Sequence, residues 1–203
     1  MILAPGAGAG ADHPFLRSAA EVLASYGLST VRFDFAYRAQ GRRMPGPAAH
    51  AVLAWKTVFD RVHGDDAGAP VVAMGKSYGG RMASMAAAAG DIRAHALIYL
   101  GYPLHPPGRP DRERVAHLTE VSTPQLFLSG RRDPFVAPTE RLEEIVAALP
   151  GAAVEWIDDA GHSFELPRDR RTSHEVAAEA LSRAREFLRP ILLSPRDTPG
   201  GRV

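Results

Sequence analysis

Six short apolar runs alternate with amphipathic stretches along nearly the whole chain, and this alternation constrains the fold more than any other feature. The runs lie at residues 1–5, 28–35, 70–75, 95–101, 124–130 and 153–158. They are rich in β-branched and aromatic residues and most end near Gly, Pro or Asp, which is typical of buried strands. Because helical patterns separate them, the order predicts βαβ units, a mostly parallel sheet and helices on both faces.

The amphipathic stretches predict where helices begin and end. Asp12 is expected to cap a helix that runs to Tyr26, with Gly27 just past its end. Further helices are predicted over 52–62, with Gly64 following, over 78–90, and around the apolar face of Leu142, Ile145, Val146 and Leu149. The last helix has capping-box spacing at Thr172 and Glu175, and Pro190 is expected to end it.

The length of the chain limits how many domains it can form. With 203 residues it can bury one sizeable core but is too short for two ordinary domains. We therefore expect a single-domain three-layer αβα sandwich over residues 1–193 with about six strands in its sheet. Residues 194–203 are predicted to be a disordered tail. The longest irregular segment, 102–123, is expected to hold a short helical piece.

Composition excludes several classes of function. The net charge is +1, so no large electrostatic field points to nucleic acid or to an anionic membrane. There is no cysteine, which excludes disulfides, thiolate metal sites and cysteine nucleophiles. No apolar run is long enough to cross a bilayer, and the N-terminus does not read as a signal peptide, so a cytoplasmic location is expected. The histidines show no clustered ligand spacing, and neither a metal nor another cofactor is expected.

The strongest local motif is Gly75-Lys76-Ser77-Tyr78-Gly79. It matches G-x-S-x-G, with a predicted strand before it and a predicted helix after it, as in a nucleophile elbow. The tight turn would strain the serine backbone, and the glycines would remove side chains where strand and helix approach closely. The pattern predicts that the Ser77 hydroxyl stands clear of the sheet at a helix N-terminus, which favours developing negative charge.

A serine hydroxyl needs an adjacent base, and the chain supplies one with an acid in the order Ser, Asp, His. Asp133 follows the run at 124–130, and His162 follows the run at 153–158. Carboxyl ends of parallel strands meet at one edge of a sheet, so both should lie beside the elbow. His162 is expected to take the Ser77 proton, and Asp133 to orient the imidazole. Asp158 and Asp159 are alternative acids that we expect to cap the turn instead.

An oxyanion hole for this chemistry needs two backbone donors. The Tyr78 N–H, directly after the nucleophile, is expected to be one. The other is expected from the glycine-rich loop after the first strand, with Ala7 as first choice and Gly8 as second.

These motifs resemble the α/β-hydrolase superfamily, and within it the lidless dienelactone-hydrolase-like branch. GKSYGGRMAS, FDFAYRAQGRRMPG, YPLHPPGRP and SGRRDPF together are similar to a bacterial group related to testis-expressed protein 30 and to subunit 3 of the NSL complex. The resemblance implies a hydrolase fold without its first two strands, with strand order 2-1-3-4-5-6 counted from Met1. It implies a carboxylesterase- or thioesterase-like serine hydrolase acting on a small-molecule ester. Two departures are Pro5-Gly6 in place of the usual His-Gly, and a chain that begins inside the strand.

Two other motif matches offer different ligands. Gly75-Lys76-Ser77 could end a phosphate-binding P-loop, but Pro70 stands where that motif needs glycine. The loop Gly6-Ala7-Gly8-Ala9-Gly10-Ala11 fits the dinucleotide-binding G-x-G-x-x-A, with Asp34 placed as the ribose-binding acid. An NAD(P)-binding Rossmann-like domain is therefore an alternative function, although it leaves Ser77, Asp133 and His162 unexplained.

A third alternative is a non-catalytic interaction protein on a hydrolase fold, since fold does not establish activity. The substrate itself cannot be identified from the sequence, but the short 102–123 segment predicts an open, shallow site without a large lid. The basic residues near the elbow and loops are interpreted as solvated surface. They are Arg42, Arg43, Lys76, Arg81, Arg131 and Arg132.

The strand over 28–35 is expected to form an open edge of the sheet, since it would have only one neighbour. The edge could pair across a two-fold axis, be covered by the loop 36–47, or be covered by strands encoded upstream of Met1. Protection by the loop or by arginine is the expected outcome. A monomer or a homodimer is compatible with the sequence.

Overall fold

A single parallel sheet of six strands organises the molecule, and a computed structural model describes it for residues 1–65, 68–168 and 170–193. The strand order is β2-β1-β3-β4-β5-β6, as expected from the sequence. The strands are β1 Ile2–Ala4, β2 Val31–Arg32, β3 Val72–Lys76, β4 Ala96–Leu100, β5 Gln125–Gly130 and β6 Ala152–Ile157. Strands β3, β4 and β5 are buried along their whole length, which explains their unbroken apolar runs.

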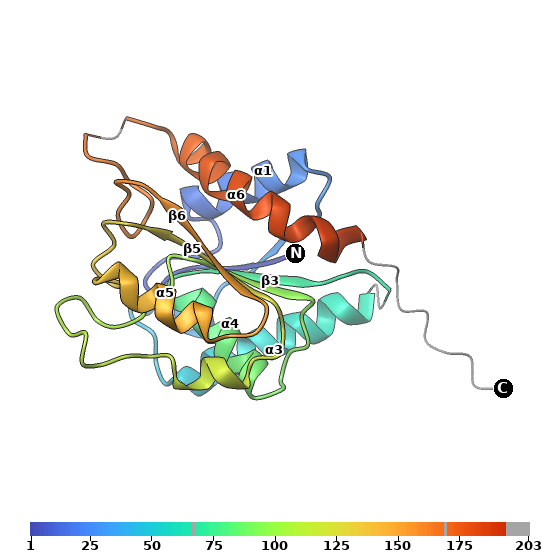
Figure 1. Cartoon of the computed structure of the whole chain (residues 1–203). Coiled ribbons are helices and arrows are strands. Elements are labelled where there is room, and N and C mark those ends of the chain that lie inside the picture. The colour runs from blue at the N-terminus through green and yellow to red at the C-terminus, as the bar shows by residue number, and fades with distance from the viewer. Residues whose placement is uncertain (66–67, 169, 194–203) are drawn as a thin grey trace.

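Helices cover both faces of this sheet and make the three layers (Figure 1). α1 (Pro14–Ser25) and α6 (Ser173–Leu193) lie together on one face, over a core that includes Leu3, Met74 and Ile98. The opposite face carries α2 (Ala36–Ala39), α3 (Ala48–Asp65), α4 (Tyr78–Ala88), η1 (Ala116–Glu120) and α5 (Thr139–Ala147). None of the helices in the described ranges is long and apolar enough to span a membrane.

Three helix boundaries differ from the sequence prediction. His13, not Asp12, caps α1: its Nδ1 accepts the Phe15 N–H at 3.3 Å, while Asp12 pairs with Arg32. Gly64 lies inside the last turn of α3 rather than after it. Pro190 does not end α6, which continues to Leu193, because a proline near a helix end removes only one hydrogen-bond donor.

The edge strand is far shorter than predicted. Of the expected 28–35 segment only Val31 and Arg32 pair, with Ile2 and Leu3 of the three-residue β1. The Leu28 N–H donates to the Leu23 carbonyl near the end of α1, so it does not pair with a neighbouring strand. An edge of two residues offers little backbone for pairing with another chain, although Val31 is 42% exposed. The short length of β2 therefore limits how far this sheet edge could pair with another chain.

The segment 102–123 packs against the face that carries α4, and its short helical piece is η1, as predicted. It holds no longer helix that could cover the carboxyl ends of the strands. The segment 194–203, predicted to be a disordered tail, lies outside the described residues.

Candidate active site

Ser77 stands on the turn between β3 and α4 in a backbone conformation that an L-residue rarely adopts, with φ 47° and ψ −112°. Such a conformation costs about 1–3 kcal/mol and persists only where its surroundings impose it. Here its N–H donates to the Leu100 carbonyl of β4 at 3.0 Å, and its own carbonyl accepts the Arg81 N–H at 3.0 Å. Ser77 is also the N-cap of α4, so its hydroxyl lies at the positive end of the helix.

Glycines make this turn possible, as the motif predicted. A Cβ on Gly79 would lie 2.5 Å from the Pro5 carbonyl oxygen, and one on Gly80 would lie 2.7 Å from that of Gly75. A Cβ on Gly75 would collide with the backbone of Gly79 and Gly80. Backbone atoms cannot move aside cheaply, so any side chain at these positions would force strand and helix apart.

The structure brings Ser77, His162 and Asp133 together from three different loops. His162 Nε2 lies 2.8 Å from Ser77 Oγ, and His162 Nδ1 lies 2.7 Å from Asp133 Oδ2. The Asp133 side chain is fully buried, and its other oxygen accepts the Phe135 N–H at 2.8 Å. The Phe135 ring packs on the imidazole with centroids 4.2 Å apart. Nucleophile, base and acid geometry is therefore present in one chain of hydrogen bonds.

The two alternative acids point elsewhere. Asp158 pairs with Arg131 at 3.0 Å, and Asp159 pairs with Arg132 at 2.6 Å. Their side chains are 84% and 63% exposed, whereas Asp133 is enclosed. Asp133 is the carboxylate that His162 contacts.

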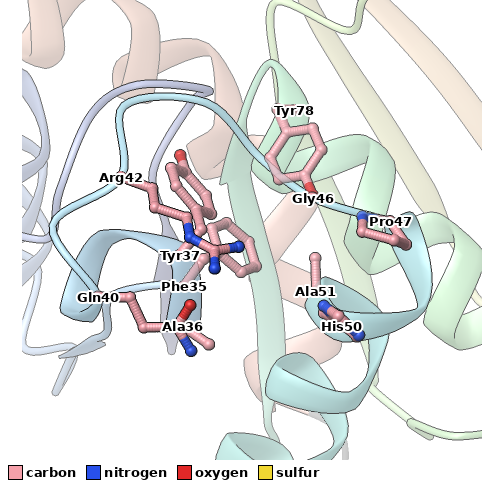
Figure 2. Close-up of a pocket in the computed structure, with 10 residues that line it drawn as sticks. All are labelled: Phe35, Ala36, Tyr37, Gln40, Arg42, Gly46, Pro47, His50, Ala51 and Tyr78. Atoms are coloured by element: carbon pink, nitrogen blue, oxygen red, sulfur yellow. The ribbon is translucent and has the colours of Figure 1, made fainter.

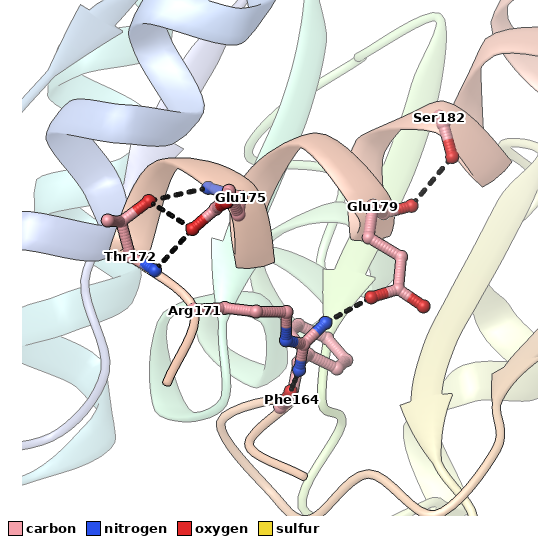
Figure 3. Close-up of polar contacts among 6 residues, drawn as sticks. All are labelled: Phe164, Arg171, Thr172, Glu175, Glu179 and Ser182. Carbon is pink, nitrogen blue, oxygen red and sulfur yellow. Dashed lines mark hydrogen bonds and ion pairs between the residues drawn. The ribbon is translucent and has the colours of Figure 1, made fainter. Parts of the chain in front are cut away.

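The loop that carries His162 is held to the rest of the fold at several points (Figure 3). Gly161 donates to the Glu165 carbonyl at 2.8 Å, which closes the turn around the histidine. The Arg171 guanidinium donates to the Phe164 carbonyl at 2.8 Å and pairs with Glu179 of α6. The expected capping box at the start of α6 is also present, with the Glu175 N–H donating to Thr172 Oγ1 at 3.2 Å. Of these contacts, those of Arg171 join the loop to α6.

The two predicted oxyanion donors belong to the elbow and to the glycine-rich loop after β1. Tyr78 begins α4, so its N–H is at the free end of the helix. In the glycine-rich loop the Gly8 N–H is already used, because it donates to the Tyr37 hydroxyl at 3.0 Å. Ala7, the first choice, lines the same pocket as Ser77 and His162. Sequence reasoning missed Tyr37, for which no local motif gave a signal.

Two recesses lie at the elbow, one at Ser77 and the other at Tyr78. One, of about 290 Å³, opens at Ser77 and His162 and is lined further by Ala7, His13 and Lys76. The other, of about 230 Å³, lies beside Tyr78. Figure 2 shows the rings of Phe35, Tyr37 and Tyr78 around it, with the Arg42 side chain extending over it.

Lys76 corrects the interpretation of the basic residues as solvated surface. It ends β3 directly before Ser77, is only 9% exposed, and donates to the His162 carbonyl at 2.8 Å. Burial lowers its pKa to about 8, while the charges of Asp133 and Glu165 act in the opposite direction. Lys76 lies one residue past the apolar run predicted at 70–75, so the sequence pattern gave no signal of its burial.

Asp34, the candidate ribose-binding acid, uses one carboxylate oxygen to hold the glycine-rich loop. Asp34 Oδ1 accepts the Ala11 N–H at 2.7 Å and would be only 2.9 Å from a Cβ on Gly10. The carboxylate therefore holds the loop itself, which gives Asp34 a structural role without a nucleotide.

Comparisons with known proteins place this geometry among hydrolases. A family described as "Alpha/beta hydrolase domain" matches residues 1–189. Carboxymethylenebutenolidase of Rhodococcus opacus is 29% identical over 191 residues, which cover 86% of this chain and 75% of that protein. Carboxymethylenebutenolidase of Pseudomonas putida is 33% identical over 120 residues, or 58% of this chain. That match covers 48% of the Pseudomonas protein, so the chain spans about half the length of this relative.

Solved structures share the fold. An alpha-beta serine hydrolase homologue from Coxiella burnetii superimposes with a TM-score of 0.71 at 21% identity, covering 90% of this chain and 83% of the other. Dienelactone hydrolase from Anabaena variabilis superimposes with a TM-score of 0.66 at 24% identity, covering 90% and 84%.

Proposed function

This chain belongs to the α/β-hydrolase family, and on that basis we propose that it is a serine hydrolase that cleaves a small ester or thioester through an acyl-enzyme on Ser77. The observation that carries the proposal is the continuous contact from Ser77 Oγ to His162 Nε2 at 2.8 Å and from His162 Nδ1 to Asp133 Oδ2 at 2.7 Å. A serine hydroxyl is a poor nucleophile unless such a base takes its proton.

Each residue has one task in the proposed reaction. Ser77 Oγ attacks the carbonyl carbon while its proton passes to His162 Nε2. The imidazolium, stabilised by Asp133, then gives that proton to the leaving alcohol or thiol as the bond to it breaks. In the second half a water molecule gives a proton to His162 and attacks the acyl carbon. The bond between that carbon and Ser77 Oγ then breaks, His162 returns the proton to Ser77 Oγ, and the carboxylic acid leaves.

Negative charge on the carbonyl oxygen is stabilised by the N–H groups of Tyr78 and Ala7, each from a backbone position that folding has already fixed. Removing one such donor in comparable enzymes costs about 10²–10³ in kcat. Pro5 stands just before this loop, and its carbonyl oxygen contacts Gly79. The glycine-rich loop thus packs on the elbow through backbone contact, with Pro5 in place of the usual histidine.

The recess at Ser77 suits a small substrate, since its volume is about 290 Å³. The relatives named carboxymethylenebutenolidase and dienelactone hydrolase agree with this, because a lactone is a cyclic ester. The likeness to testis-expressed protein 30, the cytoplasmic location and the monomeric or homodimeric state stay predictions from the sequence.

Covalent labelling tests the proposal most directly. A fluorophosphonate probe should label the wild-type chain at Ser77, as read by mass spectrometry, and Ser77→Ala should abolish labelling. Ser25→Ala, which alters a serine at the end of α1 on the opposite face of the sheet, is the matched control and should be labelled like wild type. Equal labelling of Ser77→Ala would refute the assignment of the nucleophile. Absence of labelling together with stabilisation by NAD(H) would favour the dinucleotide-binding alternative.

A further inference from the structure

Lys76 is the one buried ammonium beside the proposed nucleophile, among the described residues. Its Nζ reaches across the sheet edge to the carbonyl of His162, 86 positions further along the chain, at 2.8 Å. It also lies 5.8 Å from the centroid of the Phe164 ring, two residues past the histidine. The proposed reaction gives Lys76 no role. Burying a charged group costs free energy unless an ion pair or hydrogen bonds compensate for the lost hydration.

The contact occupies a space that the fold leaves open for it. Gly101, at the end of β4, has φ 70°. A Cβ there would lie 2.9 Å from the His162 carbonyl oxygen and 3.2 Å from Lys76 Nζ. A side chain at this position would therefore press on both partners. The glycine directly after β4 therefore leaves room for the hydrogen bond between Lys76 and the His162 carbonyl.

No acidic side chain in the described part of the chain forms an ion pair with Lys76. The negative charges that act on Lys76 are those of Asp133 and Glu165, and both carboxylates have other partners: Asp133 accepts from His162, and Glu165 accepts the Ser163 N–H at 2.7 Å. Burial lowers the pKa of His13, before α1, and the positive charge of Lys76 lowers it further. The ammonium therefore donates its hydrogen bond to the backbone carbonyl of His162, and a charged donor makes that bond about twice as strong as a neutral one would.

We propose that Lys76 is a positioning residue for the base: its ammonium holds the backbone of His162, and so keeps the imidazole between Asp133 and Ser77. This rests on the proposed function, since it gives the lysine a task only if His162 is the base. A displacement of about 1 Å of a catalytic group can cost about 10²-fold in rate. The positioning is strongest while the lysine carries its proton.

The pH dependence follows from the sign of the charge. Because the pKa of Lys76 is about 8, the ammonium is present below that pH and is lost above it. Activity should therefore fall as the pH rises through about 8, where the bond to the His162 carbonyl becomes a neutral one. Arg in place of Lys would stay charged through this range.

The chain offers a matched control, because Lys56 and Lys76 are its only lysines. The experiment measures the rate of inactivation by a fluorophosphonate probe, and kcat and KM for 4-nitrophenyl acetate, from pH 6.5 to 9.5. The variants are Lys76→Met, Lys76→Arg and Lys56→Met. Lysine labelled with ¹³C in the wild-type chain gives two side-chain ε signals, which Lys56→Met assigns and which report the titration of Lys76 directly.

We expect Lys76→Met to lower kcat and the inactivation rate about 10- to 100-fold with KM little changed, and to lose the decline above pH 8. Lys56→Met should behave as wild type, and Lys76→Arg should retain activity to higher pH. In the wild-type chain the midpoint of the alkaline decline should coincide with the Lys76 signal in the titration, a comparison that needs no variant to fold.

Wild-type kinetics in Lys76→Met, or an alkaline midpoint that differs from the Lys76 titration, would overturn the positioning role. If Ser77 is labelled normally in that case, the proposed function survives. If the wild-type chain is not labelled at all, both proposals fail.

Discussion

The carboxylate of Asp133 lies 2.7 Å from Nδ1 of His162, although 29 positions separate them in the sequence. The contact forms because β5 and β6 are neighbours in register, so the loops that follow them leave the sheet at the same edge. Folding thus pairs two residues that no local motif connects.

Replacing this acid should have a large effect on the proposed reaction. Asp133→Asn keeps the shape of the side chain but removes the charge that orients the imidazole, so kcat should fall about 10³- to 10⁴-fold. Asp159→Asn is the control, because Asp159 is exposed and pairs with Arg132. Steady-state hydrolysis of 4-nitrophenyl acetate measures both. A greater loss of kcat in Asp159→Asn than in Asp133→Asn would show that Asp133 is not the acid that orients His162.

The close backbone contact between Gly79 and the Pro5 carbonyl should not tolerate an added side-chain atom. Gly79→Ala places a Cβ 2.5 Å from the Pro5 carbonyl oxygen, and we expect a loss of about 1–3 kcal/mol in the free energy of unfolding. Gly64→Ala is the matched control: it lies in the last turn of α3 with no heavy atom within 4 Å of the added Cβ. Alanine should stabilise that position by about 0.5–1 kcal/mol. Urea unfolding compares the two, and equal effects of the two changes would contradict the packing argument.

Tyr37 should influence the proposed oxyanion loop from outside it. Its hydroxyl accepts the Gly8 N–H at 3.0 Å, next to the donor Ala7, while the ring is buried beside Phe35. Tyr37→Phe removes only the hydroxyl and should lower kcat about 10-fold without raising KM, because the loop is less well fixed. Tyr26→Phe, between α1 and α6, should have no such effect. Unchanged kcat in Tyr37→Phe would show that Gly8 is held without the tyrosine.

Sequence patterns predicted the parts of the fold that depend on local periodicity. The buried strands follow from apolar runs, and the glycines at the elbow follow from a motif with strict steric demands. The strand order was implied by the resemblance to the α/β-hydrolase superfamily. The length of β2 could not be predicted, because it depends on a three-residue partner strand. Asp12 was predicted to cap α1, but its side chain pairs with Arg32 and the His13 side chain caps the helix instead, a tertiary effect that the local pattern does not show.

The burial of the Lys76 side chain could not be predicted from the sequence pattern either. Lys76 has the same type and charge as Lys56, yet one donates to a carbonyl beside the site and the other pairs with Asp60 on the surface of α3. The difference depends on the tertiary position of the His162 loop, which lies against the end of β3.

The buried lysine should also leave a mark on stability, with a sign opposite to its effect on activity. Its pKa falls from 10.5 in the unfolded chain to about 8 in the folded one, so between these values the unfolded state binds more protons. The free energy of unfolding contributed by this group must then rise with pH over that window. Relative to Lys76→Met, which cannot titrate, the wild-type chain should gain about 2 kcal/mol between pH 7 and 9.5. Urea unfolding of both proteins at several pH values measures the difference and cancels the contributions of the other groups. A difference that stays constant across this range would mean that the ammonium is not desolvated in the folded protein.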